Sequence, residues 1–382
     1  MMRKKLLIVV SGAKFFLSHR LALAQAAAAS GYEVHVATPA SSLSHSITAA
    51  GLMYHCISLD RGGFNPCRDV MAFFSLYRLY QKIKPDIVHQ VTLKPILYGG
   101  LAARLAQVPS VVNAFTGLGY LFISDRFLMQ GLRKLVELGY KIGFRHPNLR
   151  VIFQNNEDRW QFVDKKLLHE RNTVLIRGSG VDMKAFSFSE ESNDTPVVIL
   201  PARMLWDKGV AEFVAAARMI QHRGFAVRFA LIGEGDAANP AVVPTQQLHD
   251  WVREGVVEWW GERHDMPAVM RQSHIVCLPS YREGLPRVLV EAAASGRAII
   301  TTETPGCREV VSHGKNGLLV PIKNVTALVE AIITLLNNPE LRKTMGRLGR
   351  QRVERDYDLA VILQQTLAIY ENLDQPTFNA LV

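Results

Sequence analysis

Two glutamates in the stretch YREGLPRVLVEAAASGRAII have the chemistry to bind a ligand rich in hydroxyl groups. The preceding run HIVCLPS reads as a buried strand, which predicts Glu283 in the loop at its carboxyl end and Glu291 on the following helix. Pro286 suits the first helical turn, and Gly284 lets a ligand approach the backbone. Each carboxylate can accept hydrogen bonds from vicinal hydroxyls. On spacing alone, two solvated surface charges remain the alternative.

Two cations follow an earlier strand in the same half of the chain. In PARMLWDKGV, Arg203 and Lys208 come after the strand-like run VVIL and before a helical pattern. Two cations at a strand end can neutralise a diphosphate, although a pair of surface charges is the alternative for this spacing. The turn in LIGEGD, flanked by Gly233 and Gly235, is a weaker indication of a ligand site.

The elements that must position these residues alternate between strand-like and helical runs. The chain of 382 residues is 48% apolar, enough for two domains with cores of their own. Alternation of this kind predicts parallel sheets wrapped by helices, and we expect a Rossmann-like domain over 1–178, a second over 179–360 and a C-terminal helix within 361–382 that packs back on the first domain. The segment 177–196 is the predicted linker. Because ligands of open parallel sheets bind at the carboxyl ends of the strands, we expect the site in a cleft between two facing domains.

Charge is distributed unevenly along the chain. Residues 1–178 hold 23 Lys and Arg against 10 Asp and Glu, a net +13, whereas 179–382 hold 21 against 24, a net −3. A basic first half suits an anionic membrane surface, a phosphorylated ligand or nucleic acid. No apolar run is long enough to span a bilayer. The basic and apolar start resembles a secretory signal, but its apolar core is only LLIVV, and the strand-like GYEVHVAT follows.

The four cysteines, Cys56, Cys67, Cys277 and Cys307, lack paired or metal-ligand spacing and fit reduced thiols in the cytosol. Asp356 and Asp358 form an Asp-x-Asp motif far from any predicted strand end. We therefore predict neither a metal site nor a cofactor.

Together these motifs resemble the retaining glycosyltransferases of family 4, which have the GT-B fold of two Rossmann-like domains. The resemblance covers nearly the whole chain. It is strongest in PSYREGLPRVLVEAAASGRAII, which matches the family's E-x7-E signature, and in RMLWDKG; it extends to PDIVHQVTLKPILYGGLAARLA, RGSGVDMKAF and WWGERHDMPAVM.

The resemblance implies a UDP-sugar donor and a role for each matched residue. Arg203 and Lys208 would bind the diphosphate, Glu291 the ribose and Glu283 the transferred sugar, so that Glu283, Arg203 and Lys208 carry the catalysis. Backbone around Arg263 would contact the base. The implied donor-binding positions are Gly12, Arg203, Lys208, Arg263, Glu283, Gly284, Leu285, Pro286 and Glu291.

Within the family, FFLSHR and NAFTGLGYLF look most like bacterial enzymes that extend a saccharide on a polyprenyl diphosphate, including N-acetylgalactosaminyltransferases of protein N-glycosylation. His19 and Arg20, expected to start the first helix, and Thr116 would face this acceptor. Many family members have a histidine where this chain has Thr116, so no general base is predicted. The resemblance instead implies metal-independent front-face displacement, in which the leaving diphosphate accepts the proton.

The run RFLMQGLRKLVELGYKIGFRH, residues 126–146, mixes apolar side chains with Arg126, Arg133, Lys134, Lys141 and Arg145. It predicts a helix lying on an anionic membrane, and hence a cytoplasmic protein peripheral to the inner face of the cytoplasmic membrane; an amphipathic helix packed on its own domain is the alternative.

Other function classes fit less well. A dinucleotide-dependent oxidoreductase should carry GxGxxG, which SGAKFF lacks, and a nucleic-acid-binding protein leaves the glutamates and the Arg–Lys pair without a role. A GT-B epimerase acting on UDP-N-acetylglucosamine has the same fold but different motifs.

Overall fold

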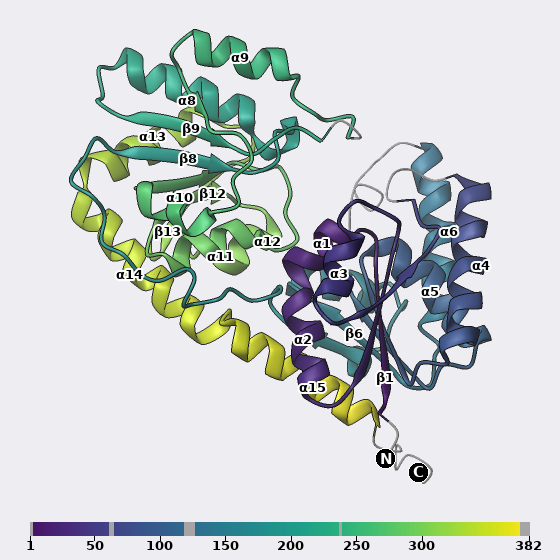
Figure 1. The fold of residues 1–382 in the computed structure, drawn as a ribbon. Helices are drawn as coiled ribbons and strands as arrows, with labels where there is room; N and C mark the ends of the chain where they lie inside the picture. Colours follow the sequence, from purple (N-terminus) through teal and green to yellow (C-terminus); the bar gives the residue numbers. More distant parts are fainter. Residues whose placement is uncertain (1–2, 61–64, 118–126, 237–238, 375–382) are drawn as a thin grey trace. The chain divides into compact units, whose positions relative to one another are not determined.

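A computed structural model describes residues 3–60, 65–117, 127–236 and 239–374 of the chain (Figure 1). The chain divides into two compact units. Unit 1 contains residues 1–179 and the segment from 362 onward, and unit 2 contains residues 180–361.

Unit 1 is built on a seven-stranded sheet in the order β3-β2-β1-β4-β5-β6-β7, in which neighbouring strands run parallel. Its central strands are almost continuous apolar runs, such as KLLIVV in β1, because helices cover both faces of the sheet. The strands are β1 (Lys5–Val10), β2 (Glu33–Thr38), β3 (Met53–Cys56), β4 (Ile87–Val91), β5 (Ser110–Ala114), β6 (Leu149–Phe153) and β7 (Thr173–Leu175).

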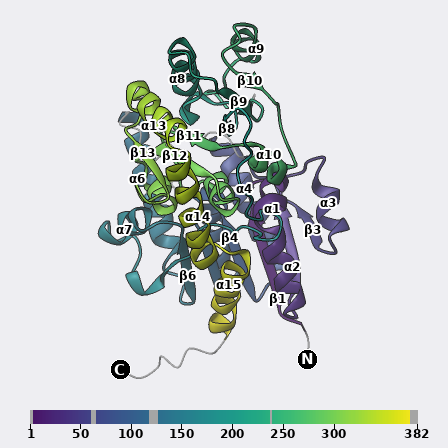
Figure 2. The same cartoon turned by 90° about the vertical axis from the view of Figure 1, so that its left-hand side faces the viewer.

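Helices lie on both faces of this sheet, with α2 and α15 towards the viewer in Figure 2. A hydrophobic core lies on each face. One face is covered mainly by α4, α5 and α6, and the other by α1, α2 and the part of α15 from residue 362. The helices are α1 (Ala13–His19), α2 (Leu21–Ala29), α3 (Ser44–Ala49), α4 (Pro66–Ile83), α5 (Leu93–Leu105), α6 (Phe127–Gly143), α7 (Asn156–Asp164) and α15 (Leu359–Asp374).

Unit 2 has a six-stranded parallel sheet in the order β10-β9-β8-β11-β12-β13. Its strands are β8 (Val197–Pro201), β9 (Arg228–Ile232), β10 (Glu258–Trp259), β11 (Ile275–Leu278), β12 (Ala298–Thr302) and β13 (Gly317–Val320). Its helices are η3 (Trp206–Lys208, a 3₁₀ turn), α8 (Val210–His222), α9 (Thr245–Arg253), α10 (Met266–Gln272), α11 (Arg287–Ala294), α12 (Pro305–Val310), α13 (Val325–Asn337) and α14 (Pro339–Asp356).

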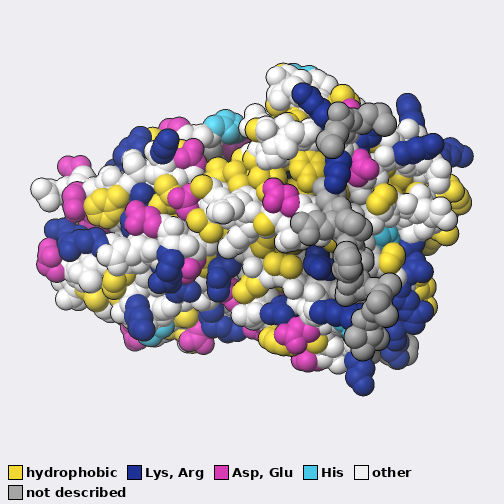
Figure 3. Space-filling view, turned by 90° about the horizontal axis from the view of Figure 1, so that it is seen from below, with side chains coloured by type: hydrophobic (Ala, Val, Ile, Leu, Met, Phe, Trp, Pro, Cys, Tyr) yellow, Lys and Arg dark blue, Asp and Glu magenta, His cyan; other side chains and the backbone are white. Residues whose placement is uncertain are grey.

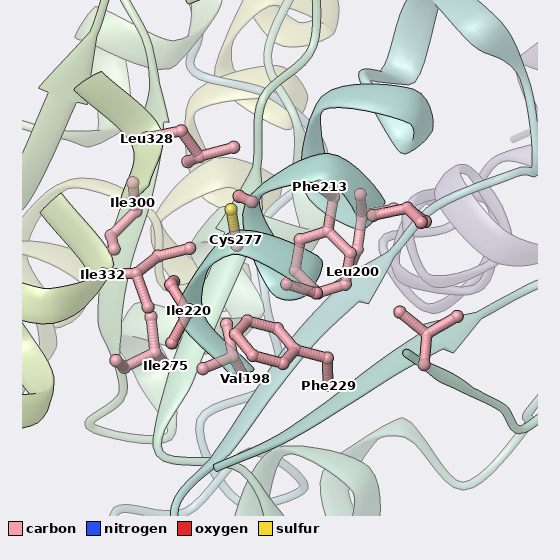
Figure 4. Close-up of a cluster of buried hydrophobic side chains, with 14 of the residues drawn as sticks. Val198, Leu200, Phe213, Ile220, Phe229, Ile275, Cys277, Ile300, Leu328 and Ile332 are labelled. Carbon is pink, nitrogen blue, oxygen red and sulfur yellow. The ribbon is translucent and has the colours of Figure 1, made fainter. Parts of the chain in front are cut away.

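One core of unit 2 lies between its sheet and helices α8 and α13. Figure 4 shows Phe213 of α8 beside Phe229 of β9, whose rings pack edge to face at 5.6 Å. Ile332 of α13 and Cys277 of β11 are fully buried in the same cluster (Figure 4). This packing fixes the sheet, and therefore the strand ends from which the candidate site is built.

When the strands are numbered within each unit, the six strands of unit 2 have the same order as the first six strands of unit 1. The strand order reverses between β1 and β4 in unit 1 and between β8 and β11 in unit 2. Such reversals are the switch points at which open parallel sheets bind ligands. The prediction of two parallel-sheet α/β domains is confirmed.

Two local details differ from the prediction. The first helix begins at Ala13 rather than at His19, because Ala13 and Phe16 bury their side chains on the sheet. Pro286 occupies the N-cap of α11 instead of its first turn.

The predicted linker packs on unit 2, where Glu191 forms a buried ion pair with Arg342 of α14 at 2.8 Å.

Candidate active site

The structure brings Lys208 and Glu283 together at the switch point of unit 2. The Lys208 Nζ atom donates a hydrogen bond of 2.6 Å to Glu283 Oε1, and the two side chains are only 18% and 13% exposed. Lys208 follows β8, and Glu283 follows β11, the neighbouring strand. The pair therefore presents one cation and one carboxylate at the edge where the sheet would bind a ligand.

Close contact between the two loops holds this pair in place. Gly209 has a φ of 74°, and a Cβ atom there would lie 2.2 Å from the Pro279 carbonyl oxygen, so only glycine allows this approach. The backbone N–H of Tyr281 donates to the Asp207 carbonyl oxygen at 2.8 Å, and the Ser280 hydroxyl donates to the same oxygen at 3.2 Å. The loop carrying Glu283 is thus tied to the loop carrying Lys208.

A further contact was not foreseen from the sequence. The Tyr281 hydroxyl donates to Glu212 Oε1 of α8 at 2.6 Å. Burial, followed by this bond and the negative charge of Glu212, raises the pKa of the Tyr281 phenol. The sequence shows Tyr281 two residues before Glu283 and Glu212 four residues after Lys208. Nothing in these positions indicates that Tyr281 and Glu212 contact each other.

Arg203 lies at the end of β8 but pairs with a different acid. Its guanidinium donates to Asp236 Oδ2 at 2.7 Å, and its side chain is 47% exposed. Surface ion pairs of this kind contribute little to stability, so the guanidinium can exchange Asp236 for an anionic ligand at low cost.

Glu291 is held inside the first turns of α11. Its carboxylate forms an ion pair of 2.8 Å with Arg287, one helical turn earlier, and its side chain is 11% exposed. Burial raises the pKa of Glu291, and the charge of Arg287 opposes that rise. A carboxylate so placed has lost hydration, which makes donated hydrogen bonds from ligand hydroxyls favourable.

The segment Gly284–Pro286 packs against the start of α12. A Cβ atom at Gly306 would lie 2.4 Å from the Gly284 carbonyl oxygen, and the Gly306 N–H donates to the Glu283 carbonyl oxygen at 3.3 Å. Leu285 is partly buried against one core of unit 2. Burial, and then the charge of Glu283, raises the pKa of the nearby Cys307 thiol to about 11. These contacts with the start of α12 hold the backbone of Gly284–Pro286 in place.

Arg263 lies after β10, where its guanidinium donates twice to Asp265, at 2.7 and 2.5 Å. This pairing holds the pKa of Asp265 down at about 2. The pair shapes an exposed loop, and contact between its backbone and a base stays a prediction.

In unit 1, Gly12 caps α1 after β1 and would leave open space around an added Cβ atom. His19 closes the same helix, stacked on Phe15 at 4.3 Å and 2.6 Å from the Ser18 hydroxyl. Thr116 follows β5 and is partly exposed. Roles for Gly12, His19 and Thr116 in binding stay predictions.

Arg20 is buried in unit 1. It is only 7% exposed, and burial lowers the pKa of its guanidinium to about 10. Its charge acts on His89 of β4 and Tyr370 of α15, whose side chains lie 2.5 Å apart. Arg20 therefore faces the interior of unit 1, and its role in acceptor binding stays a prediction.

The described residues contain no cluster of His, Cys, Asp or Glu side chains that could hold a metal ion, and all four cysteines are free thiols. What the unit 2 edge offers is a set of charged groups: Arg203 and Lys208 for an anion, and Glu283 and Glu291 for hydroxyls. This arrangement can bind a sugar that is linked to a phosphate.

Known proteins resemble the chain along most of its length. A family model described as "Glycosyl transferase 4-like" matches residues 5–154, and one described as "Glycosyl transferases group 1" matches residues 195–338. The N,N'-diacetylbacillosaminyl-diphospho-undecaprenol alpha-1,3-N-acetylgalactosaminyltransferase of Campylobacter jejuni is 29% identical over 89% of this chain and 91% of its own length. The UDP-Gal:alpha-D-GlcNAc-diphosphoundecaprenol alpha-1,3-galactosyltransferase of Escherichia coli is 26% identical over 79% of each.

The fold has solved counterparts as well. A crystal structure of Anabaena HepE in complex with UDP superposes with a TM-score of 0.75, at 17% identity, over 97% of this chain and 100% of that one. Each of the two parallel-sheet units is matched by a glycosyltransferase family model, in agreement with this structural likeness. The chain therefore belongs to the GT4-like, group 1 glycosyltransferases of GT-B fold.

Proposed function

We propose that this glycosyltransferase transfers a hexose or N-acetylhexosamine from a UDP-sugar to a saccharide carried on a polyprenyl diphosphate, with retention of configuration. The observation that carries the proposal is the Lys208–Glu283 pair at the switch point of unit 2, with Arg203 following the same strand. The activities of the two relatives support the lipid-linked acceptor, and UDP bound to the Anabaena protein supports the donor.

In this proposal each charged group has a separate task. Lys208 and Arg203 would exchange their present acid partners for oxygens of the diphosphate, and the negative charge that develops there in the transition state would strengthen both contacts. Glu291 would accept hydrogen bonds from the ribose. Glu283, once Lys208 has turned to the phosphate, would accept them from the transferred sugar.

The bond changes balance without a protein base or a metal ion. The bond between the anomeric carbon and the diphosphate oxygen breaks, and the acceptor hydroxyl oxygen bonds to that carbon from the same face. The acceptor proton passes to the departing diphosphate. Because Glu283 and Lys208 have binding roles in this proposal, the leaving diphosphate is the proposed proton acceptor.

A first experiment tests the donor and the reaction together. We expect UDP to raise the melting temperature in a thermal-shift screen, and NAD and oligonucleotides not to do so. Mass spectrometry should then detect transfer from UDP-N-acetylgalactosamine or UDP-galactose to a polyprenyl-diphosphate-linked N-acetylglucosamine, with EDTA present. Loss of activity in EDTA that Mg²⁺ restores would refute the metal-free reaction, and stabilisation by NAD instead of UDP would refute the donor.

We also propose that unit 1 lies on an anionic membrane, where a polyprenyl-linked acceptor is held. On α6, Lys134, Leu138 and Lys141 follow one another along a single exposed stripe, and the exposed Arg145 lies in the turn after the helix. Leu135, Leu138 and Ile142 of this helix are 41% to 66% exposed, which is unusual for apolar side chains facing water alone.

Helix α4 extends this surface. Its exposed apolar residues, Val70, Met71 and Phe74, precede the exposed cations Arg78 and Lys82 on the same helix. Both α4 and α6 pack beside α5. At the right-hand margin of Figure 3, over these helices, Lys and Arg side chains flank hydrophobic ones.

No helix within the described ranges combines the length and apolarity that crossing a bilayer requires. The surface of α4 and α6 therefore supports binding at the headgroup level, with apolar side chains in the interface and cations on anionic lipid. Arg126, at the start of the predicted basic run, lies outside the described residues.

A further inference from the structure

A second lysine–carboxylate pair, with no assigned role, lies in unit 1. Lys94 Nζ is 2.9 Å from Asp69 Oδ1, and the two side chains are 12% and 13% exposed. Lys94 is in the first turn of α5, and Asp69 is in the first turn of α4. Tyr98, one turn beyond Lys94, also hydrogen-bonds to Asp69. Three polar groups therefore meet where two helices begin.

The position of this pair parallels that of the proposed donor pair. Lys208 follows β8, the strand at the switch point of unit 2, and Lys94 follows β4, a strand at the switch point of unit 1. Both pairs are buried to nearly the same degree. Desolvated ion pairs contribute little to stability on balance. Because both pairs lie where open parallel sheets bind ligands, we infer that they bind ligands rather than stabilise the fold.

The backbone beside Lys94 is strained. Thr92, at the end of β4, has φ of 76° and ψ of 165°, a conformation that is normally confined to glycine. Its hydroxyl donates to the hydroxyl of Ser11, which follows β1 across the switch point, at 3.1 Å. Its N–H donates to the Ala114 carbonyl oxygen of β5 at 3.1 Å. The fold thus maintains an unfavourable corner that sets where α5, and hence Lys94, begins.

The polar groups at this edge favour a neutral ligand. At the switch point itself, Ser11 and Thr92 supply hydroxyls where unit 2 supplies charges. In unit 2 a second cation, Arg203, follows the same strand as Lys208 and adds to the attraction for an anion, whereas Lys94 lies near the hydroxyls of Ser11 and Thr92. A polyol suits such a mixed set of groups, because its hydroxyls can donate to Asp69 and accept from Lys94 while the ion pair stays intact.

We propose that Lys94 and Asp69 bind the saccharide of the lipid-linked acceptor by its vicinal hydroxyl groups. The proposal rests on the proposed function, since that function supplies the acceptor. It also accounts for the position of the pair in the fold: Asp69 immediately precedes the exposed apolar residues Val70 and Met71, so α4 would offer a carboxylate to the sugar and an apolar surface to the lipid side.

Binding measurements test this assignment independently of turnover. The probes are farnesyl diphosphate carrying N-acetylglucosamine, farnesyl diphosphate without a sugar, and UDP, each titrated by calorimetry into wild type, Lys94→Gln and Asp69→Asn. We expect both variants to weaken the sugar-bearing lipid about 10-fold or more, since a buried charged partner is lost. Affinity for the bare lipid and for UDP should stay unchanged.

Lys165→Gln is the matched control, because Lys165 also forms a lysine–carboxylate pair in unit 1, with Glu137 at 2.6 Å. It should change none of the three affinities. Unchanged affinity for the bare lipid, which we place on unit 1, shows that unit 1 of Lys94→Gln and Asp69→Asn is folded.

Three results would overturn the assignment. If both variants weaken the two lipids equally, the pair binds the diphosphate; if they lower the melting temperature and leave all affinities intact, the pair only links α4 and α5. The third is wild-type protein that binds the two lipids with equal affinity. Sugar-specific binding without any transfer would contradict the proposed function and leave this site standing.

Discussion

The edges of the two sheets differ in their polar groups although the first six strands of unit 1 have the same order as the six strands of unit 2. In unit 2 the carboxylate partner of Lys208 comes from the loop after the adjacent strand β11, so charges meet at the switch point itself. In unit 1 that position is taken by the hydroxyls of Ser11 and Thr92, and the carboxylate partner of Lys94 comes from helix α4. One architecture therefore presents two ion pairs at the edge that we propose for a nucleotide diphosphate, and hydroxyls with one ion pair at the edge that we propose for a saccharide.

The largest effect should come from breaking the charged edge. In Lys208→Ala the diphosphate loses a cation, and Glu283, 13% exposed, loses its partner. We expect UDP affinity to fall by about 1.5 to 3 kcal/mol, with a larger loss in turnover because the contact strengthens in the transition state. Calorimetry and steady-state kinetics measure the two losses separately.

Lys343→Ala provides the control for this variant, because Lys343 pairs with Glu340 in an exposed position of unit 2. It should leave both quantities unchanged. If Lys208→Ala binds UDP with wild-type affinity, Lys208 does not bind the diphosphate, and the proposed contrast between the two edges is wrong.

The two glutamates should separate the nucleotide from the sugar within unit 2. Glu291 is held by Arg287 on α11, whereas Glu283 lies in the loop beside Lys208. We expect Glu291→Gln to weaken UDP itself by about 1 kcal/mol or more, and Glu283→Gln to spare UDP while it slows transfer at least 10-fold. If calorimetry finds the same loss of UDP affinity in both variants, the division of roles is wrong.

The proposed membrane surface gives a smaller expected effect that is confined to unit 1. Lys134 and Lys141 of α6 and Arg145 after it are exposed, and each cation near anionic lipid contributes on the order of 1 kcal/mol. Wild type should therefore sediment with anionic liposomes and not with zwitterionic ones, and rising salt should release it. Changing all three residues to glutamate should abolish sedimentation and leave UDP affinity intact.

A matched control takes its charges from unit 2. Arg347→Glu and Arg355→Glu alter exposed cations of α14 and should not affect liposome binding. Wild type that ignores anionic liposomes at low salt, yet glycosylates a lipid-linked acceptor, would show that the basic surface serves another purpose.

Sequence patterns predicted the central part of each sheet well, because strands such as β1, β2, β4, β8, β9 and β11 are short apolar runs followed by helical patterns. They also placed Glu283 in a loop, Glu291 on a helix, and Arg203 and Lys208 after a strand. These are local properties of the chain, which periodicity and turn residues specify directly.

Pairing across the fold could not be predicted in the same way. Which acid Lys208 contacts depends on the parallel register of β8 and β11, and Arg203 turned out to face Asp236. The pattern SHR placed Arg20 at a helix start, but only the packing of α15 over the sheet explains why its guanidinium is buried near His89 and Tyr370. No local pattern indicates the pairing of Lys94 with Asp69, because Asp69 lies 25 residues earlier in the chain.

The smallest expected effect is a difference in acid sensitivity between the units. Burial lowers the pKa of His89 and His146 in unit 1 and of His274 in unit 2 below the ordinary value of 6.5. Each folded imidazole therefore binds its proton less readily than the unfolded one, so its contribution to stability is complete above about pH 6.5 and is lost as the pH falls towards the lowered pKa.

Unit 1 should lose more stability than unit 2 on acidification, because it holds two of these three histidines and the His89 pKa is lowered further by the charge of Arg20. Hydrogen exchange followed by mass spectrometry between pH 7.5 and 5 reports on each unit separately. We expect protection in β4 to fall before protection in β8, and His89→Gln to reduce that difference. Equal loss of protection in both strands, or a pH dependence that His89→Gln leaves unchanged, would mean that these imidazoles do not control acid stability and that the two units differ only at their ligand-binding edges.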